Sequence, residues 1–164
     1  MTSLRFAELA SAAGLPAGAL NIVTGYGREA GAALAAHPDI NLITFTGSPK
    51  VGVEIQTAAA RNHVKCVLEL GGKSPQIVFA DADLEKAVPI IVGAIIQNAG
   101  QTCSAGSRLL VQRDIYDQVI ERVAARFREI RVGAPESSPD CGPIITRAQF
   151  ERVQRFIAEC KDSG

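Results

Sequence analysis

The chain has no tryptophan, little histidine and no excess of charge of either sign. Among its 164 residues are two histidines, and 17 Lys and Arg balance 17 Asp and Glu. This balance provides no electrostatic basis for binding nucleic acid or an acidic membrane surface. Its longest apolar run, residues 87–96, is far shorter than the roughly 20 residues of a membrane span, and no signal peptide is recognisable. We therefore expect a cytoplasmic protein with no nucleic-acid or membrane partner.

Cysteine is scarce as well, with four residues and no CxxC pair. Neither histidine lies near a cysteine pair, which argues against a zinc site. A disulfide framework is not expected in a chain that is 47% hydrophobic and can form an apolar core. Cys66, Cys141 and Cys160 are interpreted as small buried residues.

Hydrophobic segments alternate between short strands and helices. The predicted strands are residues 19–23, 41–45, 64–70, 76–79 and 109–112. The predicted helices are residues 4–13, 28–37, 49–61, 84–98, 115–130 and 147–161. This order predicts an α/β fold with a parallel sheet flanked by helices, and a glycine-rich break at residues 71–75 indicates a hinge or a domain boundary.

Polar residues mark several of the predicted helix starts. Ser48, Asp83, Asp114 and Thr146 are predicted to cap the helices that follow them. Pro89 lies inside a predicted helix, so we expect either a kink there or a helix that begins later.

Four segments contain residues suited to a functional site. Gly25 lies in one glycine-rich turn, and Gly47 and Ser48 lie in another, where helix N–H groups could bind a phosphate. Glu69 ends a strand, where a buried carboxylate could take a proton from water. Cys103 lies in a loop of small residues whose backbone N–H groups could stabilise an oxyanion. Taken singly, each segment is explained at least as well by a structural role.

Taken together, two segments resemble the active-site signatures of the aldehyde dehydrogenase superfamily. Residues 69–73, Glu-Leu-Gly-Gly-Lys, are similar to its glutamate signature, and residues 98–108 are similar to its cysteine signature. Further similar segments, in the same order, are residues 15–27, 45–48 and 142–153. The resemblance therefore covers essentially the whole chain.

This resemblance implies oxidation of a small-molecule aldehyde to an acid with NAD or NADP. Cys103 would attack the carbonyl as a thiolate, giving a thiohemiacetal and then a thioester, and its backbone N–H would form half of the oxyanion hole. Glu69 would activate the water that releases the acid. The residues expected near the cofactor are Gly47 and Ser48 at the pyrophosphate, Leu70 at the nicotinamide, and Gly25.

The resemblance also implies that residues 1–70 form the late part of a cofactor-binding domain and residues 71–164 the first part of a catalytic domain. Full-length family members are expected to be homo-oligomers. Two alternatives stay open. A non-catalytic remnant that completes the sheet of a full-length subunit would co-purify with a larger dehydrogenase chain, and a cofactor-independent thiol esterase would lose ester hydrolysis on Cys103→Ala. Glu69 argues against an acyl-phosphate reductase, which needs no base for thioester hydrolysis.

Family members are much longer than this chain, so we predict that the isolated chain is inactive or nearly so, and marginally stable. A sheet that lacks its partner strands exposes edges and apolar faces. The purified 164-residue protein should show no substantial NADH formation when it is mixed with an aldehyde and NAD. Substantial turnover would contradict this prediction.

Overall fold

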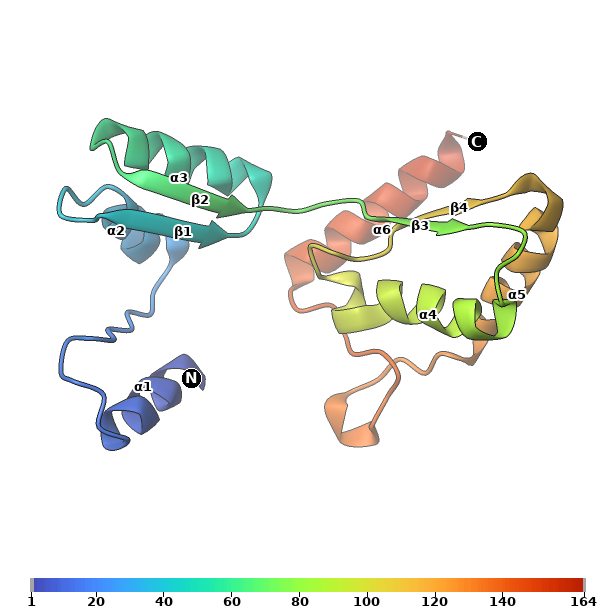
Figure 1. Cartoon of the computed structure of the whole chain (residues 1–164), viewed down its shortest axis with the longest axis horizontal. Coiled ribbons are helices and arrows are strands. Elements are labelled where there is room, and N and C mark those ends of the chain that lie inside the picture. Colours follow the sequence, from blue (N-terminus) through green and yellow to red (C-terminus); the bar gives the residue numbers. More distant parts are fainter. Residues whose placement is uncertain (1, 164) are drawn as a thin grey trace. The chain divides into compact units, whose positions relative to one another are not determined.

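The computed structural model describes residues 2–163 and divides into two compact units, residues up to Leu70 and residues from Gly71 onward. Each unit contains one pair of parallel strands with its own helices (Figure 1). This arrangement confirms the predicted α/β class with parallel strand pairing. Across residues 2–163, no helix combines the length and the apolar character that crossing a membrane requires.

The first unit pairs two parallel strands that are joined through a helix. Its helical elements are α1 (Thr2–Ala12), the π-helical turn η1 (Gly27–Gly31), α2 (Ala32–Ala35) and α3 (Pro49–Arg61), and its strands are β1 (Leu42–Thr46) and β2 (Lys65–Glu69). Leu42 lies opposite Lys65, and Thr46 lies opposite Glu69. Helix α3 makes the crossover that parallel strands require and packs alongside the pair (Figure 1). The two strands therefore end at the same edge.

The residues at both ends of helix α3 explain where it begins and ends. The Ser48 hydroxyl accepts a hydrogen bond from the Val51 N–H at 3.3 Å, and Pro49 occupies the first helical position, as predicted. The helix ends at Arg61, and His63 then adopts a left-handed φ of 56°. Within the helix, Gly52 is buried because Leu70 packs over it, and a Cβ at this position would lie 2.8 Å from Leu70 Cδ2.

One predicted strand of the first unit is absent, and one predicted helix differs at its ends. Residues 19–23 form no strand but an irregular segment, in which Val23 is 80% exposed. A strand needs a hydrogen-bonded neighbour, and none of the described strands pairs with this segment. The helix predicted at residues 28–37 is present, but it begins as the π-helical turn η1 and ends two residues early, at Ala35.

The second unit also pairs two parallel strands across a helix. Its strands are β3 (Pro75–Val78) and β4 (Arg108–Val111), and its helices are α4 (Leu84–Ile96), α5 (Tyr116–Glu129) and α6 (Arg147–Asp162). Short helical turns are η2 (Gln97–Gly100), η3 (Arg113–Ile115) and η4 (Pro135–Ser137). Pro75 lies opposite Arg108, and Val78 lies opposite Val111.

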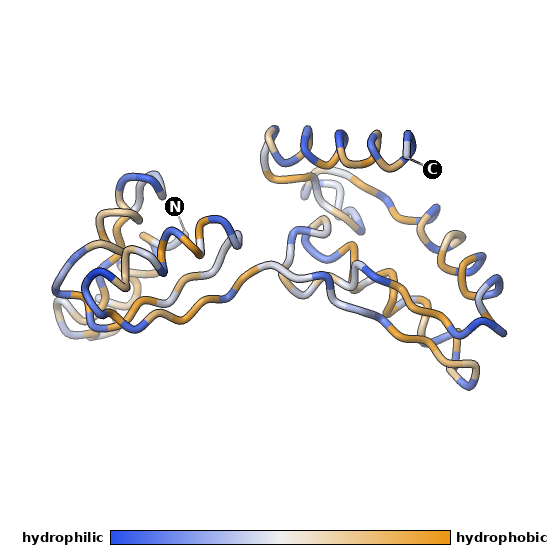
Figure 2. Tube along the Cα trace, turned by 90° about the horizontal axis from the view of Figure 1, so that it is seen from above, coloured by the Kyte–Doolittle hydropathy of each residue, from blue (hydrophilic) through white to orange (hydrophobic). Residues whose placement is uncertain are grey.

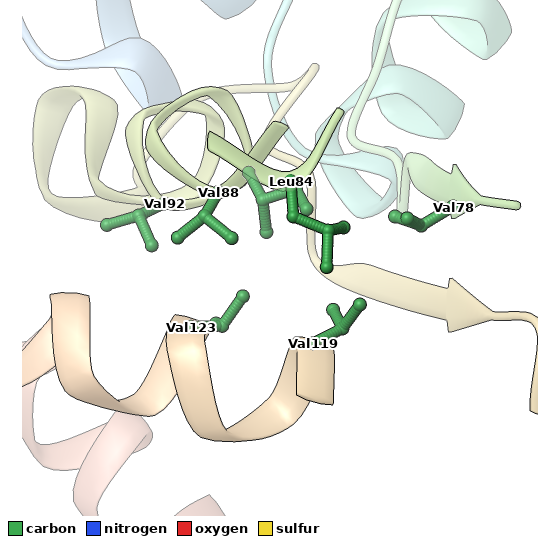
Figure 3. Close-up of a cluster of buried hydrophobic side chains, with 7 residues drawn as sticks. Val78, Leu84, Val88, Val92, Val119 and Val123 are labelled. Carbon is green, nitrogen blue, oxygen red and sulfur yellow. The ribbon is translucent and has the colours of Figure 1, made fainter. Parts of the chain in front are cut away.

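A small apolar core joins α4, α5 and β3. Leu84, Val88 and Val92 recur at the spacing that places side chains on one helix face, and they point toward α5 (Figure 3). Val119 and Val123 supply the facing surface, and Val78 and Ile91 complete the buried cluster. Val92 and Val119 are 1% and 0% exposed, so this helix pair contains the largest fully buried side chains among the described residues.

The caps predicted for α4 and α6 are present. An Asp83 carboxylate oxygen accepts from the Lys86 N–H at 3.4 Å, and the Thr146 hydroxyl accepts from the Gln149 N–H at 3.2 Å. The ammonium of Lys86 also pairs with Asp83 at 2.8 Å, and its hydrogen bonds hold the pKa of that carboxyl below the ordinary value.

The prediction that Asp114 caps α5 is wrong, because this residue lies inside η3 and α5 starts two residues later. The Asp114 carboxylate accepts from the side-chain amide of Gln112 at 3.1 Å instead. Helix α4 contains Pro89 and already begins at Leu84, so the alternative of a later start is also wrong.

Helix α6 is amphipathic but buries none of its residues. Its hydrophobic and hydrophilic positions alternate along the tube in Figure 2. Phe150, Phe156 and Ile157 are all exposed. The apolar face of α6 is therefore uncovered in the described part of the chain.

We expect Val92→Ala to lower the free energy of unfolding by about 2 kcal/mol, because it removes two buried methylene equivalents and leaves a cavity. Val132→Ala is the matched control, since Val132 is in the same unit and 70% exposed. Urea unfolding, followed by far-ultraviolet circular dichroism, gives the free energy of unfolding of both variants. Equal decreases in the two variants would show that the α4–α5 contact is not the core.

Candidate active site

Four of the residues predicted to form a functional site lie together where β1 and β2 end. Thr46 and Glu69 are paired in register, and the Gly47 N–H donates to the Glu69 carbonyl at 3.0 Å. Gly47 and Ser48 follow β1, and Leu70 follows β2. The parallel pairing thus brings Gly47, Ser48, Glu69 and Leu70 to one edge of the sheet.

The Phe45 ring occupies the space beside Gly47. A Cβ at Gly47 would collide with this ring, so a larger residue here would require the ring to move. The next residue, Ser48, caps α3, a helix of 13 residues whose first-turn N–H groups face away from the helix body. Such a helix start after a glycine turn is suited to bind an anion.

The side chain of Glu69 differs from what the sequence suggested, and Gly25 lies in the turn before η1. The side chain of Glu69 is exposed, so the expectation that its strand end would be buried is not met within this chain. Gly25 precedes η1, and a Cβ there would lie 3.0 Å from Ala30 Cβ.

Cys103 lies at a corner of a tight turn in the second unit. The Ala105 N–H donates to the Thr102 carbonyl at 3.2 Å, which places Cys103 and Ser104 at the two central positions of the turn. Cys103 is exposed, and its thiol is free. Within the described residues, neither the Cys103 nor the Ser104 N–H donates a hydrogen bond to the protein. The turn therefore presents a thiol together with two available N–H donors.

The end of this loop is held by a glutamine that the sequence analysis did not single out. The Gln76 amide nitrogen donates to the carbonyls of Gly106 at 2.9 Å and Ile91 at 3.2 Å. The Gly106 N–H donates to the Ala94 carbonyl at 3.2 Å. These bonds join β3, α4 and the loop. No local signal reveals this role, because it depends on contacts between residues far apart in sequence.

The beginning of the loop is a left-handed turn. Asn98, Ala99 and Gly100 have φ angles of 52°, 56° and 72°, so α4 ends at Ile96 and not at the predicted Asn98. A left-handed conformation costs non-glycine residues roughly 1–2 kcal/mol each, less for asparagine. Strain of this kind is typical of functional segments whose surroundings enforce it.

The glycine-rich segment that begins the second unit approaches the cysteine turn closely. A Cβ at Gly72 would lie 3.1 Å from the carbonyl oxygen of Cys103. The Arg108 side chain fixes this approach, because its Nε donates to the Lys73 carbonyl at 2.8 Å. Backbone therefore packs directly against backbone behind Cys103.

An open groove adjoins the left-handed turn, and its lining is mostly apolar. Ala99, Cys141, Ile144, Ile145 and Phe150 contribute to it. The remaining cysteines, like Cys103, have free thiols, but the interpretation of them as buried is wrong: Cys160 is exposed, and Cys66 and Cys141 are partly exposed. Within residues 2–163, no group of three side chains is arranged to hold a metal ion.

Asp140 fixes the loop that leads into this groove. The Arg131 backbone N–H donates to its carboxylate at 3.0 Å, and the Arg131 guanidinium donates to it at 3.1 Å. These hydrogen bonds hold the pKa of the Asp140 carboxyl below its ordinary value.

Comparison with known proteins identifies the family. The aldehyde dehydrogenase family matches residues 1–164, and the chain belongs to this family. It is 48% identical over 158 residues to hydroxyisobutyraldehyde dehydrogenase of Mycolicibacterium austroafricanum, covering 96% of this chain and 31% of that protein.

Solved structures agree with this assignment. A Burkholderia cenocepacia protein assigned to the aldehyde dehydrogenases superposes with a TM-score of 0.99 at 58% identity, over 100% of this chain and 34% of that one. An NAD-dependent aldehyde dehydrogenase from Sinorhizobium meliloti gives a TM-score of 0.96 at 46% identity, over 99% and 33%. The chain thus spans about a third of the length of these relatives.

We expect Ala99→Gly to raise the free energy of unfolding by up to about 1 kcal/mol, because glycine adopts the left-handed conformation without steric cost. The same substitution at exposed Ala125, inside α5, should lower it by about 1 kcal/mol, since glycine is a poor helix former. Thermal or urea unfolding compares the two variants, and the opposite signs are the diagnostic result. A loss of stability in both would show that the turn at Ala99 is unstrained.

Proposed function

We propose that this chain supplies the nucleophile and the general base of an NAD(P)-dependent aldehyde dehydrogenase. The observation that carries the proposal is the exposed Cys103 thiol on an anchored turn with free N–H donors, in a chain that belongs to the aldehyde dehydrogenase family. The substrate class is a small aldehyde, and the product is the corresponding carboxylic acid.

Cys103 acts as the nucleophile. Its thiolate attacks the aldehyde carbon, forming a carbon–sulfur bond and an oxyanion, which becomes a thiohemiacetal. The N–H groups of Cys103 and Ser104 are available to donate to this oxyanion, because the turn leaves them unpaired within the protein. Loss of hydride from the carbon then leaves a thioester on Cys103.

Glu69 acts as the general base for the second half-reaction. Its carboxylate takes a proton from water, which attacks the thioester carbonyl and releases the acid and the Cys103 thiol. Glu69 ends β2, and its backbone carbonyl is held by the Gly47 N–H. Its side chain is exposed and therefore free to contact water.

The edge of the first unit fits a dinucleotide. Gly47 carries no side chain that could cover the start of α3, and the capped start of α3 provides N–H groups for a phosphate. Leu70 packs over Gly52 at the same edge, and its apolar side chain would contact the ring of the nicotinamide. When bound, the oxidised nicotinamide would accept the hydride. Gly25, in the turn before η1, is proposed to lie near the cofactor as well.

The proposal is tested by grafting residues 1–164 into the matching third of the Sinorhizobium meliloti enzyme. We expect the chimera to reduce NAD when an aldehyde is added, since the chain aligns with that enzyme at a TM-score of 0.96. In the chimera, Cys103→Ala should abolish activity, and Glu69→Gln should allow one round of acylation but slow thioester release by about 100-fold or more. NADH absorbance follows turnover, and mass spectrometry of the Cys103 peptide detects the thioester.

Cys160→Ala is the matched control, because Cys160 is also an exposed free thiol. Its activity should equal that of the unmodified chimera. If a folded chimera keeps its activity after Cys103→Ala, Cys103 is not the nucleophile. A Glu69→Gln chimera with no trapped thioester and unchanged turnover would exclude Glu69 as the base.

A further inference from the structure

We propose that Gln101 is a positioning residue for Cys103, because its side chain holds the strained turn from which the cysteine loop emerges. The inference rests on the proposed function, since it concerns how the nucleophile is presented. Gln101 does not touch the reacting atoms in this proposal. It acts through the backbone between residues 98 and 103.

Both the nitrogen and the oxygen of the Gln101 side-chain amide form hydrogen bonds. Its Nε2 donates to the Asn98 carbonyl at 3.0 Å, and its Oε1 accepts from the Ile145 N–H at 3.0 Å. Ile145 immediately precedes Thr146, the N-cap of α6. Gln101 therefore ties the left-handed turn to the start of a helix far along the chain.

Asn98 and Gln101 are joined by two further hydrogen bonds. The Asn98 side-chain amide donates to the Gln101 carbonyl at 3.2 Å, and the Gln101 N–H donates to the Asn98 carbonyl at 3.1 Å. Together with the Gln101 side chain, they close the turn on itself. This bonding accounts for how Ala99, which is not glycine, stays at a φ of 56°.

Removal of the Gln101 side chain would let the turn relax toward right-handed backbone. Such a relaxation rotates the peptide planes that lead into Cys103, and so redirects its N–H. The thiol itself would stay exposed. A reaction that builds an oxyanion beside Cys103 should therefore suffer, whereas a reaction that needs only an accessible thiolate should not.

Two reagents separate these effects in the 164-residue chain. In p-nitrophenyl acetate, the thiolate attacks the ester carbonyl through an oxyanion, p-nitrophenolate leaves, and a thioester forms. In iodoacetamide, the thiolate displaces iodide directly and no oxyanion forms. Mass spectrometry of the digested protein gives both rate constants for each cysteine, and exposed Cys160 is the internal reference.

We expect the ratio of acylation to alkylation rate constants to be higher for Cys103 than for Cys160. Gln101→Ala should lower the Cys103 acylation rate by about tenfold or more, as for loss of an oxyanion donor, and change alkylation by less than about twofold. Adding Ala99→Gly to this variant should restore most of the loss, because glycine holds the left-handed turn unaided. The matched control is Gln97→Ala, a glutamine in η2 with no side-chain hydrogen bond in the described structure.

The proposal is overturned if Gln101→Ala leaves the ratio unchanged, if the ratio for Cys103 in the parent equals that for Cys160, or if acylation and alkylation fall together. Should circular dichroism show Gln101→Ala to be unfolded, Gln101→Glu replaces it. Glutamate keeps the acceptor for the Ile145 N–H but has no donor for Asn98, so the same selective loss is expected, and an unchanged ratio counts against the proposal. Neither reagent requires NAD or an aldehyde, so failure of the dehydrogenase proposal does not affect this result.

Discussion

Parallel strand pairing is the constraint on which the second unit depends, because it forces the chain to leave β3 and return to the start of β4. Helix α4 makes this return with 13 residues, about 20 Å, whereas the four residues of β3 span only about 13 Å. The helix therefore overshoots the strand, and the chain must reverse sharply before β4. The left-handed turn makes that reversal. The loop that follows leads back from the end of α4 to the start of β4, and this loop contains Cys103. The position of the thiol follows from the geometry of the crossover.

The two units differ in how much they bury. In the first, the buried side of α3 consists of Gly52 and Ala59, and α1 buries nothing. In the second, α4 and α5 enclose branched aliphatic side chains. Burial of apolar side chains is the main source of stability. The second unit therefore contributes most of the stability of the isolated chain. The edge formed by Gly47 and Ser48 thus belongs to the more weakly packed half of the chain.

Most helix caps, which neighbouring residues set, were predictable from the sequence, with Asp114 as the exception, whereas features set by distant residues were not. The caps at Ser48 and Thr146 were predicted correctly, because a hydroxyl and an N–H three residues on are sufficient to form them. The strand at residues 19–23 was predicted wrongly, since apolar residues form a strand only beside a partner. The signatures containing Glu69 and Cys103 could be recognised, but the left-handed conformation of Ala99 and the links through Gln76 depend on tertiary contacts.

Gly72 shows how a residue with no side chain can limit variation around a reactive group. Its Cα lies so close behind the Cys103 carbonyl that even a methyl group would press on that peptide at 3.1 Å. Alanine at this position would keep the thiol, the charge and the polarity of the loop, yet it would displace the peptide that carries the nucleophile by a few tenths of an ångström. A position that contributes no chemical group can therefore limit which residues are tolerated beside the reactive loop.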